Sequence, residues 1–425
     1  MRRSLALVIL LLSSAILIGC WDRVELEERA FIMTIGIDLV KAEKTEPLED
    51  TGVWQEEPPP QAAELPSARK EVRQGGDVTG LPATPIPGPG KEKMYKVTVE
   101  IANPGAMGGD QGGGGGGGGA SAPANWVLST TGDTISEAIS ELATRTGRRP
   151  YLGHLMMIVV GEDAAREGLG GVIDFFVRSG EVTRTAKFMV AAGEAADVLK
   201  VKPKLDRLIA VYLERTLQSR EVTSRFRERD LNRLLRDLRF DNATLVARVT
   251  PFEEEAKVAG AGIIAGNRLV GYLGEAETRA ALLILGELAG GTLVIPCPDE
   301  DGGRVTYLLD EATRTIRPEW REDHLHFSVE IEMSGRVAER TCPSPINPQF
   351  LAKVGEGVAA QVEREVTFVL KKLQRDFGAD VLQLGEELWR RDPKLWRRID
   401  WRQEFPRATF DIKVKVKVTA YGQST

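Results

Sequence analysis

Leu325-His-Phe-Ser-Val-Glu-Ile-Glu-Met333 alternates apolar and polar residues with a period of two. Alternate side chains of a strand point to one face, so this stretch predicts a strand with one buried face. Asn347-Pro348 caps a predicted long helix that ends at Gly378, and residues 410–418 alternate again. Two alternating strands around one long helix predict an antiparallel α+β unit, which we place at residues 303–425. The apolar stripe of the helix comprises Leu351, Val354, Val358, Val362, Val366, Val369 and Leu373.

Upstream of this unit, residues 201–302 form a predicted middle domain. Residues 205–238 predict two charged amphipathic helices, and the second carries leucines at 231, 234, 235 and 238 on one face. The apolar residues of 261–272 predict a hairpin, with Gly266-Asn267 as the turn.

The N-terminal part, residues 20–200, alternates strand and helix patterns. Apolar runs at 31–40, 155–160 and 187–191 predict strands, and so does the alternating run at 95–101. Residues 134–146 and 171–179 predict helices. We therefore expect a mixed α/β domain here, within an α+β chain of three domains that has mixed sheets and packed helices.

Two insertions interrupt the predicted N-terminal domain. Residues 41–93 include Glu-Glu-Pro-Pro-Pro at 56–60, and residues 107–124 include eight consecutive glycines at 112–119. Neither composition buries enough apolar surface to offset chain entropy, so both are expected to be disordered. A phosphate-binding loop needs spaced glycines that open a helix, and the glycine run lacks that spacing.

The first residues have the pattern of a lipoprotein leader. Arg2 and Arg3 precede an apolar run at 5–18, Gly19 is the small residue before the cut, and Cys20 follows it. We interpret residues 1–19 as a signal peptide and Cys20 as the lipidation site, with acyl chains such as palmitate holding the chain on the outer face of the cell membrane. The alternatives are an uncleaved anchor, for which the run is short, or an ordinary secretory signal.

The net charge bears on the class of partner, and the cysteines bear on a possible disulfide. The net charge is −6 with both signs interspersed, which argues against a nucleic-acid partner. Apart from Cys20, the cysteines are Cys297 and Cys342, each followed by proline. Outside the membrane a disulfide between them is permitted, and two free thiols are the alternative.

The sequence presents no recognisable catalytic or metal-binding motif. It has three histidines, and His324 and His326 share the polar face of their predicted strand with Glu330. A third nearby ligand is not evident, so we interpret them as solvated face residues rather than metal ligands. His154 precedes a buried strand and is interpreted as a structural residue. We predict no cofactor and no catalytic residue.

Two further sets of residues are read as structural. Lys413, Lys415 and Lys417 lie on one face of the last predicted strand and indicate the solvated face or the edge of a sheet, with anionic headgroups as the alternative contact. Trp389, Trp396 and Trp401 are irregularly spaced and are expected to pack the C-terminal domain.

Several spaced blocks carry a family resemblance. Gly19-Cys-Trp-Asp-Arg-Val-Glu-Leu-Glu-Glu-Arg29 resembles the opening of the Ger(x)C lipoproteins, the C subunits of nutrient germinant receptors in spore-forming bacteria. Further blocks that match this family are 147–154, 158–162, 165–168, 174–178, 262–273, 378–385 and 401–406. The resemblance implies a three-domain mixed α/β lipoprotein that works with two integral-membrane subunits at the inner membrane of the spore. The two low-complexity insertions depart from the family.

We therefore expect a non-enzymatic, lipid-anchored receptor subunit that helps to trigger germination. Trp21, Asp22 and Glu25 follow the lipid directly and are the expected contact with the membrane partners, a simple tether being the alternative. A lipid-anchored peptidoglycan hydrolase and a solute-binding lipoprotein are the competing functions. The solute-binding class needs two similar lobes around a hinge, and the predicted second half does not resemble the first.

Overall fold

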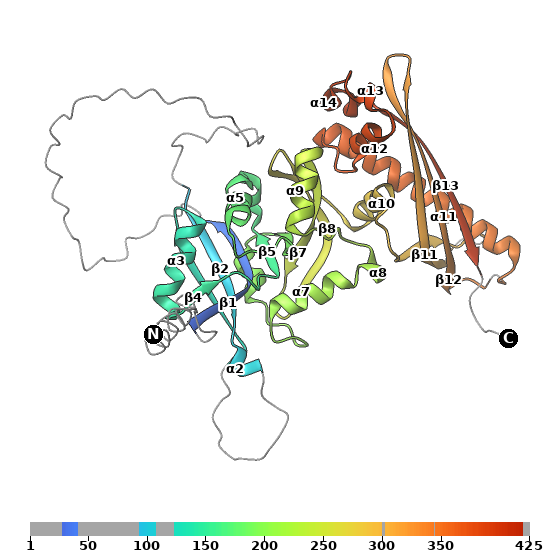
Figure 1. Cartoon of the computed structure of the whole chain (residues 1–425). Helices are drawn as coiled ribbons and strands as arrows, with labels where there is room; N and C mark the ends of the chain where they lie inside the picture. Colours follow the sequence, from blue (N-terminus) through green and yellow to red (C-terminus); the bar gives the residue numbers. More distant parts are fainter. Residues whose placement is uncertain (1–27, 41–92, 108–122, 300–301, 344, 420–425) are drawn as a thin grey trace, which may run out of the picture. The chain divides into compact units, whose positions relative to one another are not determined.

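The computed structural model describes residues 28–40, 93–107, 123–299, 302–343 and 345–419 (Figure 1). The predicted leader, 1–19, lies outside these residues, as do all but the margins of the predicted insertions 41–93 and 107–124. The described helices and strands belong to one compact unit built around two sheets. None of the described helices is long and apolar enough to span a bilayer.

The first sheet has the order β3-β2-β1-β5-β6-β7-β8-β9, with β4 paired to β1. The strands β1, β5, β6 and β7 run parallel to one another, and β4 is parallel to β1. The pairs β1–β2, β2–β3, β7–β8 and β8–β9 are antiparallel. The bounds are β1 Arg29–Leu39, β2 Tyr95–Ala102, β3 Asn125–Gly132, β4 Arg149–Tyr151, β5 Met157–Val160, β6 Lys187–Ala191, β7 Ala243–Pro251, β8 Ala256–Ala265 and β9 Arg268–Leu273.

Helices cover both faces of this sheet, which explains the continuous apolar run of β5. On one face, Ile158 and Val160 pack with α3 (Ile135–Thr146), α4 (Glu162–Glu167), α5 (Gly170–Arg178) and α9 (Leu231–Phe240). On the other face, Met157 and Val159 pack with α6 (Ala195–Lys200) and α7 (Ile209–Gln218). Two shorter helices are α2 (Pro104–Met107) and α8 (Arg220–Thr223).

The predicted hairpin at 261–272 is confirmed as β8 and β9. Gly266 has φ 56° and Asn267 has φ 63°, as a two-residue turn that matches the strand twist requires. Because β7, β8 and β9 extend the first sheet, that sheet continues across the boundary predicted at 200/201. The three-domain division stays a prediction.

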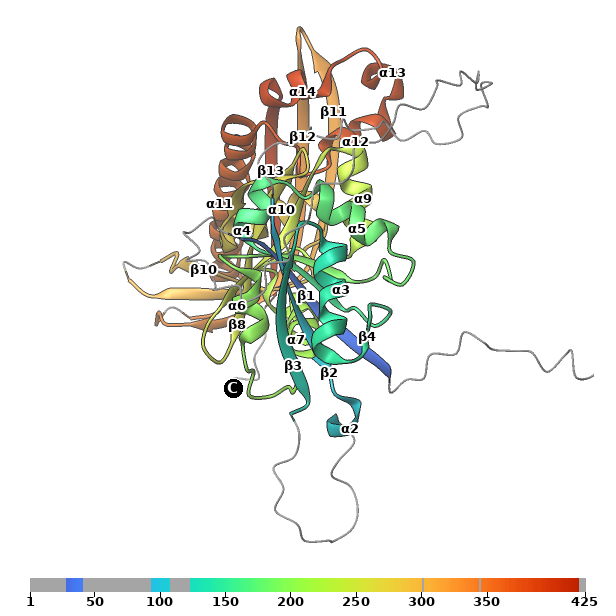
Figure 2. The ribbon, with the colours of Figure 1, turned by 90° about the vertical axis from the view of Figure 1, so that its left-hand side faces the viewer.

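The second sheet has the order β10-β11-β12-β13, with bounds Thr292–Pro296, Arg304–Arg321, His324–Arg340 and Thr409–Thr419. The long helix α11 (Pro348–Lys372) lies along it (Figure 2). Asn347 Oδ1 accepts the Phe350 N–H at 2.8 Å, the valines of the predicted stripe are buried, and Gly378 follows with φ 56°. The α+β fold, the helix cap and the apolar stripe are confirmed.

One detail of the C-terminal prediction is wrong. The strands β12 and β13 are parallel, with His326 opposite Thr409 and Arg336 opposite Thr419, whereas an antiparallel pair was expected. The reason is the connection. The helix α11 carries the chain back along the sheet, so β13 begins beside the start of β12, as in any strand–helix–strand crossover. Only β10, β11 and β12 form the antiparallel part.

The remaining α-helices are α10 (Glu275–Leu285), which links the two sheets, and the short α12 (Leu384–Arg391), α13 (Pro393–Trp396) and α14 (Trp401–Glu404). A π-helical turn, Leu373–Phe377, continues α11, and Phe405–Arg407 form a 3-10 turn. Core residues of α10 belong to the same apolar cluster as β8 of the first sheet and β11, β12 and α11 of the second. The two sheets therefore share part of one core.

Candidate functional site at the junction of the two sheets

The residues predicted to act at the membrane are Cys20, Trp21, Asp22 and Glu25. All four lie outside the described residues, so their roles stay predictions. The remaining predicted residues are placed by the structure, most of them in or near the second sheet and His154 beside β1 of the first sheet.

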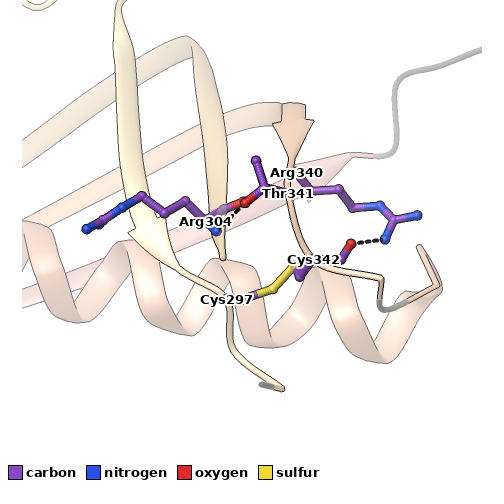
Figure 3. Close-up of a disulfide and its surroundings, with 5 residues drawn as sticks. All are labelled: Cys297, Arg304, Arg340, Thr341 and Cys342. Carbon is purple, nitrogen blue, oxygen red and sulfur yellow. Dashed lines mark hydrogen bonds between the residues drawn. A yellow bond between two sulfur atoms is a disulfide. The ribbon is translucent and has the colours of Figure 1, made fainter. Parts of the chain in front are cut away.

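Cys297 and Cys342 form a disulfide, which resolves the choice that the sequence left open (Figure 3). Their Cα atoms are 6.4 Å apart, and both residues are buried. Cys297 follows β10 and Cys342 follows β12, so the bridge ties these strands together across the start of the intervening β11. The Arg304 N–H also donates to Thr341 Oγ1 at 2.8 Å. The disulfide thus covalently links the chain segments that follow β10 and β12 at one end of the second sheet.

The interpretation of His326 as a solvated residue is wrong. Only 6% of its surface is exposed, and Nδ1 lies 2.9 Å from Thr409 Oγ1. Burial lowers its pKa, so the neutral ring is favoured. Thr409 covers this position because β13 begins there, a pairing that local sequence does not reveal. His324 is only partly buried, with Nδ1 3.3 Å from Asp323 Oδ1.

Lys413, Lys415 and Lys417 lie on an edge strand of the second sheet, which was one of the two structural interpretations of these residues. The strand β13 is the last of its sheet, and Lys415 pairs across to Glu330 and Glu332 of β12. Glu330 is thus occupied by Lys415 rather than grouped with histidines. No group of three or more potential metal ligands occurs among the residues that the structure describes.

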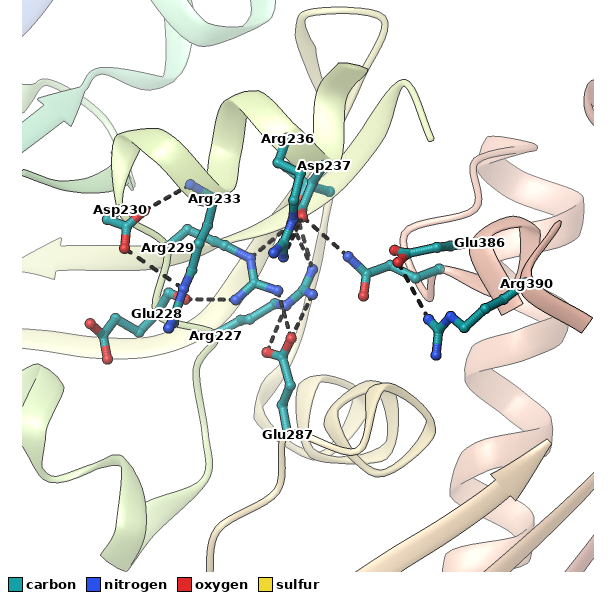
Figure 4. Close-up of polar contacts among 12 residues, drawn as sticks. Arg227, Glu228, Arg229, Asp230, Arg233, Arg236, Asp237, Glu287, Glu386 and Arg390 are labelled. Carbon is teal, nitrogen blue, oxygen red and sulfur yellow. Dashed lines mark hydrogen bonds and ion pairs between the residues drawn. The ribbon is translucent and has the colours of Figure 1, made fainter. Parts of the chain in front are cut away.

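A buried charge network, which the sequence analysis did not identify, lies where the two sheets meet (Figure 4). Arg227 donates from Nε and Nη2 to the two oxygens of Glu287 at 3.0 and 2.9 Å. Arg229 donates to Asp237 Oδ2 at 2.9 Å and to Glu287 Oε1 at 2.6 Å. The side chains of Arg227, Arg229 and Asp237 are fully or almost fully buried. Two cations and two anions balance, as burial of charge requires.

The network joins elements that are distant in the sequence. Asp237 lies on α9 beneath the first sheet, and Glu287 follows α10. Asp237 also accepts Thr244 Oγ1 of β7 at 2.8 Å and Gln383 Nε2 at 3.1 Å, and Gln383 immediately precedes α12. The run Arg225-Phe-Arg-Glu-Arg229 resembles a solvated charged face, and its burial does not alternate, because Phe226 and Arg227 are adjacent and both buried while Arg225 is exposed.

Two carboxyl groups beside the network are held in an unfavourable setting. Burial raises the pKa of Asp241 to about 9, and the charge of the nearby Asp380 is the next largest cause. Burial likewise raises the pKa of Asp380 to about 6. Its carboxylate accepts hydrogen bonds from the backbone N–H groups of Gly385 and Leu382 at 2.8 and 3.1 Å, and these bonds act to lower the pKa. Both oxygens of Asp241 are buried without a hydrogen-bond partner among the described residues. The folded protein therefore favours a protonated Asp241.

We expect the stability of the protein to fall as the pH rises from about 5 to about 9. Each carboxyl has a folded-state pKa above the ordinary 3.8, so the folded state binds more protons in this window. Asp241→Asn, which mimics the protonated acid, should flatten the decline of Tm with pH. The matched control is Asp174→Asn, an exposed carboxylate paired with Arg178. An unchanged slope in Asp241→Asn would contradict this account.

An aromatic cluster lies next to the network. Phe240 of α9 contacts Trp389 and Trp396, with ring centroids 5.5 and 6.1 Å apart. Trp401 contacts Trp396 at 5.8 Å and Phe327 of β12 at 6.2 Å. The packing role predicted for the tryptophans is confirmed for Trp396 and Trp401, which lie against the core, whereas Trp389 is exposed.

His154 takes part in a smaller aromatic group at the start of β1. Its ring lies 5.3 Å from that of Phe31 and 5.6 Å from that of Tyr151, and Arg29 lies over the Tyr151 ring. The structure places it in ring packing on the surface. The charged side chains of the junction network are paired with one another, so the network holds distant segments of the chain together.

Comparisons with known proteins find similarity to spore germination proteins along most of the chain. Residues 86–250 match the family described as Spore germination protein N-terminal domain, and residues 259–422 match Spore germination B3/ GerAC like, C-terminal. The chain is 26% identical to Spore germination protein YndF of Bacillus subtilis (strain 168), over 99% of this chain and 97% of that protein.

Two further likenesses are shorter. Spore germination protein B3 of the same organism is 25% identical over 69% of this chain and 80% of its own length. The crystal structure of the GerBC protein has a similar fold, with a TM-score of 0.53 and 21% identity, and covers 77% of this chain and 94% of that chain.

Proposed function

This chain belongs to the Ger(x)C family of spore germination proteins, and from that membership we propose that it is a non-enzymatic, lipid-anchored subunit of a nutrient germinant receptor. The match of both family domains is the observation that carries the proposal. In this role the protein is held on the outer face of the inner spore membrane by acyl chains on Cys20. It acts with two integral-membrane subunits when a nutrient triggers germination.

Two features support a position outside the membrane. Residues 1–19 have the pattern of a cleaved leader that ends before Cys20. The folded part also contains the disulfide between Cys297 and Cys342, and disulfides persist in oxidising compartments. Anchoring raises the concentration of the chain beside integral-membrane subunits, so even a weak contact between them is occupied.

The proposed contact with those subunits lies directly after the lipid, at Trp21, Asp22 and Glu25. A tryptophan at this distance from the acyl chains is favoured at the level of the headgroups. The charged residues beside it can then face a membrane partner.

A role without catalysis fits the chemistry of the folded part. In the junction network, Arg227 and Arg229 are paired with Asp237 and Glu287. His326 is held against Thr409, and His154 lies in ring packing. The hypothesis fails if the purified protein hydrolyses cortex fragments.

Cys20→Ala is the direct test of the anchor. We expect unprocessed precursor or release of the protein from spore membranes, together with loss of the nutrient response. Germination by a stimulus that bypasses nutrient receptors should be unchanged, which controls for spore quality. Unaltered membrane fractionation of the variant would overturn the assignment of Cys20.

The contact is tested with the lipid in place. Trp21→Ala combined with Asp22→Ala should leave acylation intact, reduce co-purification with the membrane subunits and slow nutrient-triggered germination. Normal germination in this double variant would reject the contact and leave residues 21–25 as a tether.

A further inference from the structure

The loop between α6 and α7 exposes an apolar side chain at its tip. Leu205 is 91% exposed, although Val201 and Leu208 on either side of it are buried. Both ends of the loop therefore pack in the core, while Leu205 is exposed to solvent between them. An isolated exposed leucine is ordinary on a protein surface, so the neighbouring residues decide its meaning.

A second exposed apolar residue lies on the turn that adjoins this loop. Lys204 forms an ion pair with Glu254, in the turn between β7 and β8, and that turn carries Phe252, which is 51% exposed. Lys202 and Arg207 are exposed beside Leu205. Long basic side chains around an apolar tip can reach phosphate headgroups while the tip enters the bilayer.

The same loop lies at the end of the first sheet where the described chain begins. Arg207 Nη1 donates to the carbonyl of Ala106 on α2 at 3.0 Å. The helix α2 directly follows β2, whose last residue, Ala102, pairs with Phe31 near the start of β1. Figures 1 and 2 both show α2 beyond this end of the sheet.

The length of chain before β1 brings this end close to the membrane. Cys20 and Arg29 are nine positions apart, and a fully extended chain of that length spans at most about 30 Å. We propose that the loop 201–208 inserts Leu205 into the bilayer, with Phe252 at its side, and so fixes the orientation of the lipid-anchored protein. The inference rests on the proposed acylation of Cys20.

The charges around Leu205 indicate whether insertion of the loop requires anionic lipids. Asp206 is paired with Arg215, Lys204 with Glu254, and the exposed Glu253 and Glu255 offset Lys202 and Arg207. With no net basic excess, apolar contact is the driving term, so insertion should occur in zwitterionic bilayers and change little with salt.

The test uses the acylated full chain in phosphatidylcholine vesicles that carry a lipid-borne quencher. Cys20 is acylated and Cys297 is bonded to Cys342, so Leu205→Cys provides a single thiol for an environment-sensitive fluorophore. The matched control is Val294→Cys, at an apolar position that is 44% exposed on β10. We expect a blue-shifted emission at 205 that the quencher reduces severalfold more than the emission at 294.

The two proposals fail separately. If the protein floats with the vesicles but the label at 205 behaves as the label at 294 does, the inserted loop is rejected and the lipid anchor stands. If the label at 205 becomes shielded only in membranes that contain the receptor subunits, the loop contacts protein and the inference is also rejected. Failure to float counts against the anchor itself.

Discussion

Arg227→Ala is expected to lower the free energy of unfolding by about 3–5 kcal/mol. The guanidinium of Arg227 is fully buried and binds Glu287 through two hydrogen bonds. Its removal leaves the carboxylate of Glu287 short of a partner in a setting where burial already raises its pKa. Arg229 must then balance both Glu287 and Asp237, with only the exposed Arg236, 3.4 Å from Asp237 Oδ1, beside it. Denaturant unfolding followed by circular dichroism measures the change.

The matched control stands two positions earlier in the same loop. Arg225 pairs with Glu275 at 2.9 Å, but its side chain is 50% exposed. Exposed ion pairs contribute about 0–1 kcal/mol, so Arg225→Ala should alter stability little. Equal effects of the two substitutions would show that the burial of the network does not determine its importance. Gln383→Ala, which removes only the link from Asp237 to the segment before α12, should lie between them.

Removal of the disulfide is the second large effect. Cys297→Ala with Cys342→Ala opens a loop between residues 45 positions apart, and loop-closure entropy places the loss at about 4 kcal/mol. Alanine is chosen because both positions are buried, and a serine hydroxyl would add an unsatisfied polar group. The readout is the denaturant midpoint of the unlabelled protein.

A reductant supplies the internal control for this prediction. Reduction should lower the midpoint of the parent protein towards that of the double variant and leave the variant itself unchanged. A parent protein whose stability is indifferent to reduction would contradict the stabilising role of the bridge. If both cysteines are also oxidised in protein taken from spores, the result supports the proposed position outside the membrane.

The candidate site illustrates how little of a buried polar network is visible in a sequence. Arg227 and Arg229 stand in a run of charges that any solvated surface could carry. Their burial depends on pairing with Asp237, on α9, and with Glu287, which follows α10. His326 was misassigned for the same reason, because Thr409, 83 residues later, covers it.

The local elements of the fold follow from the sequence. The cap at Asn347, the valine stripe of α11 and the turn at Gly266-Asn267 depend on neighbours a few residues apart, through hydrogen bonding to nearby N–H groups, helical period and positive φ. Three features are visible only in the folded chain: the parallel pairing of β13, the bond between Cys297 and Cys342, and the link from Asp237 to Gln383 across 146 residues. Such contacts depend on which way the chain returns and on what surrounds each group once water is excluded, and no local pattern contains either.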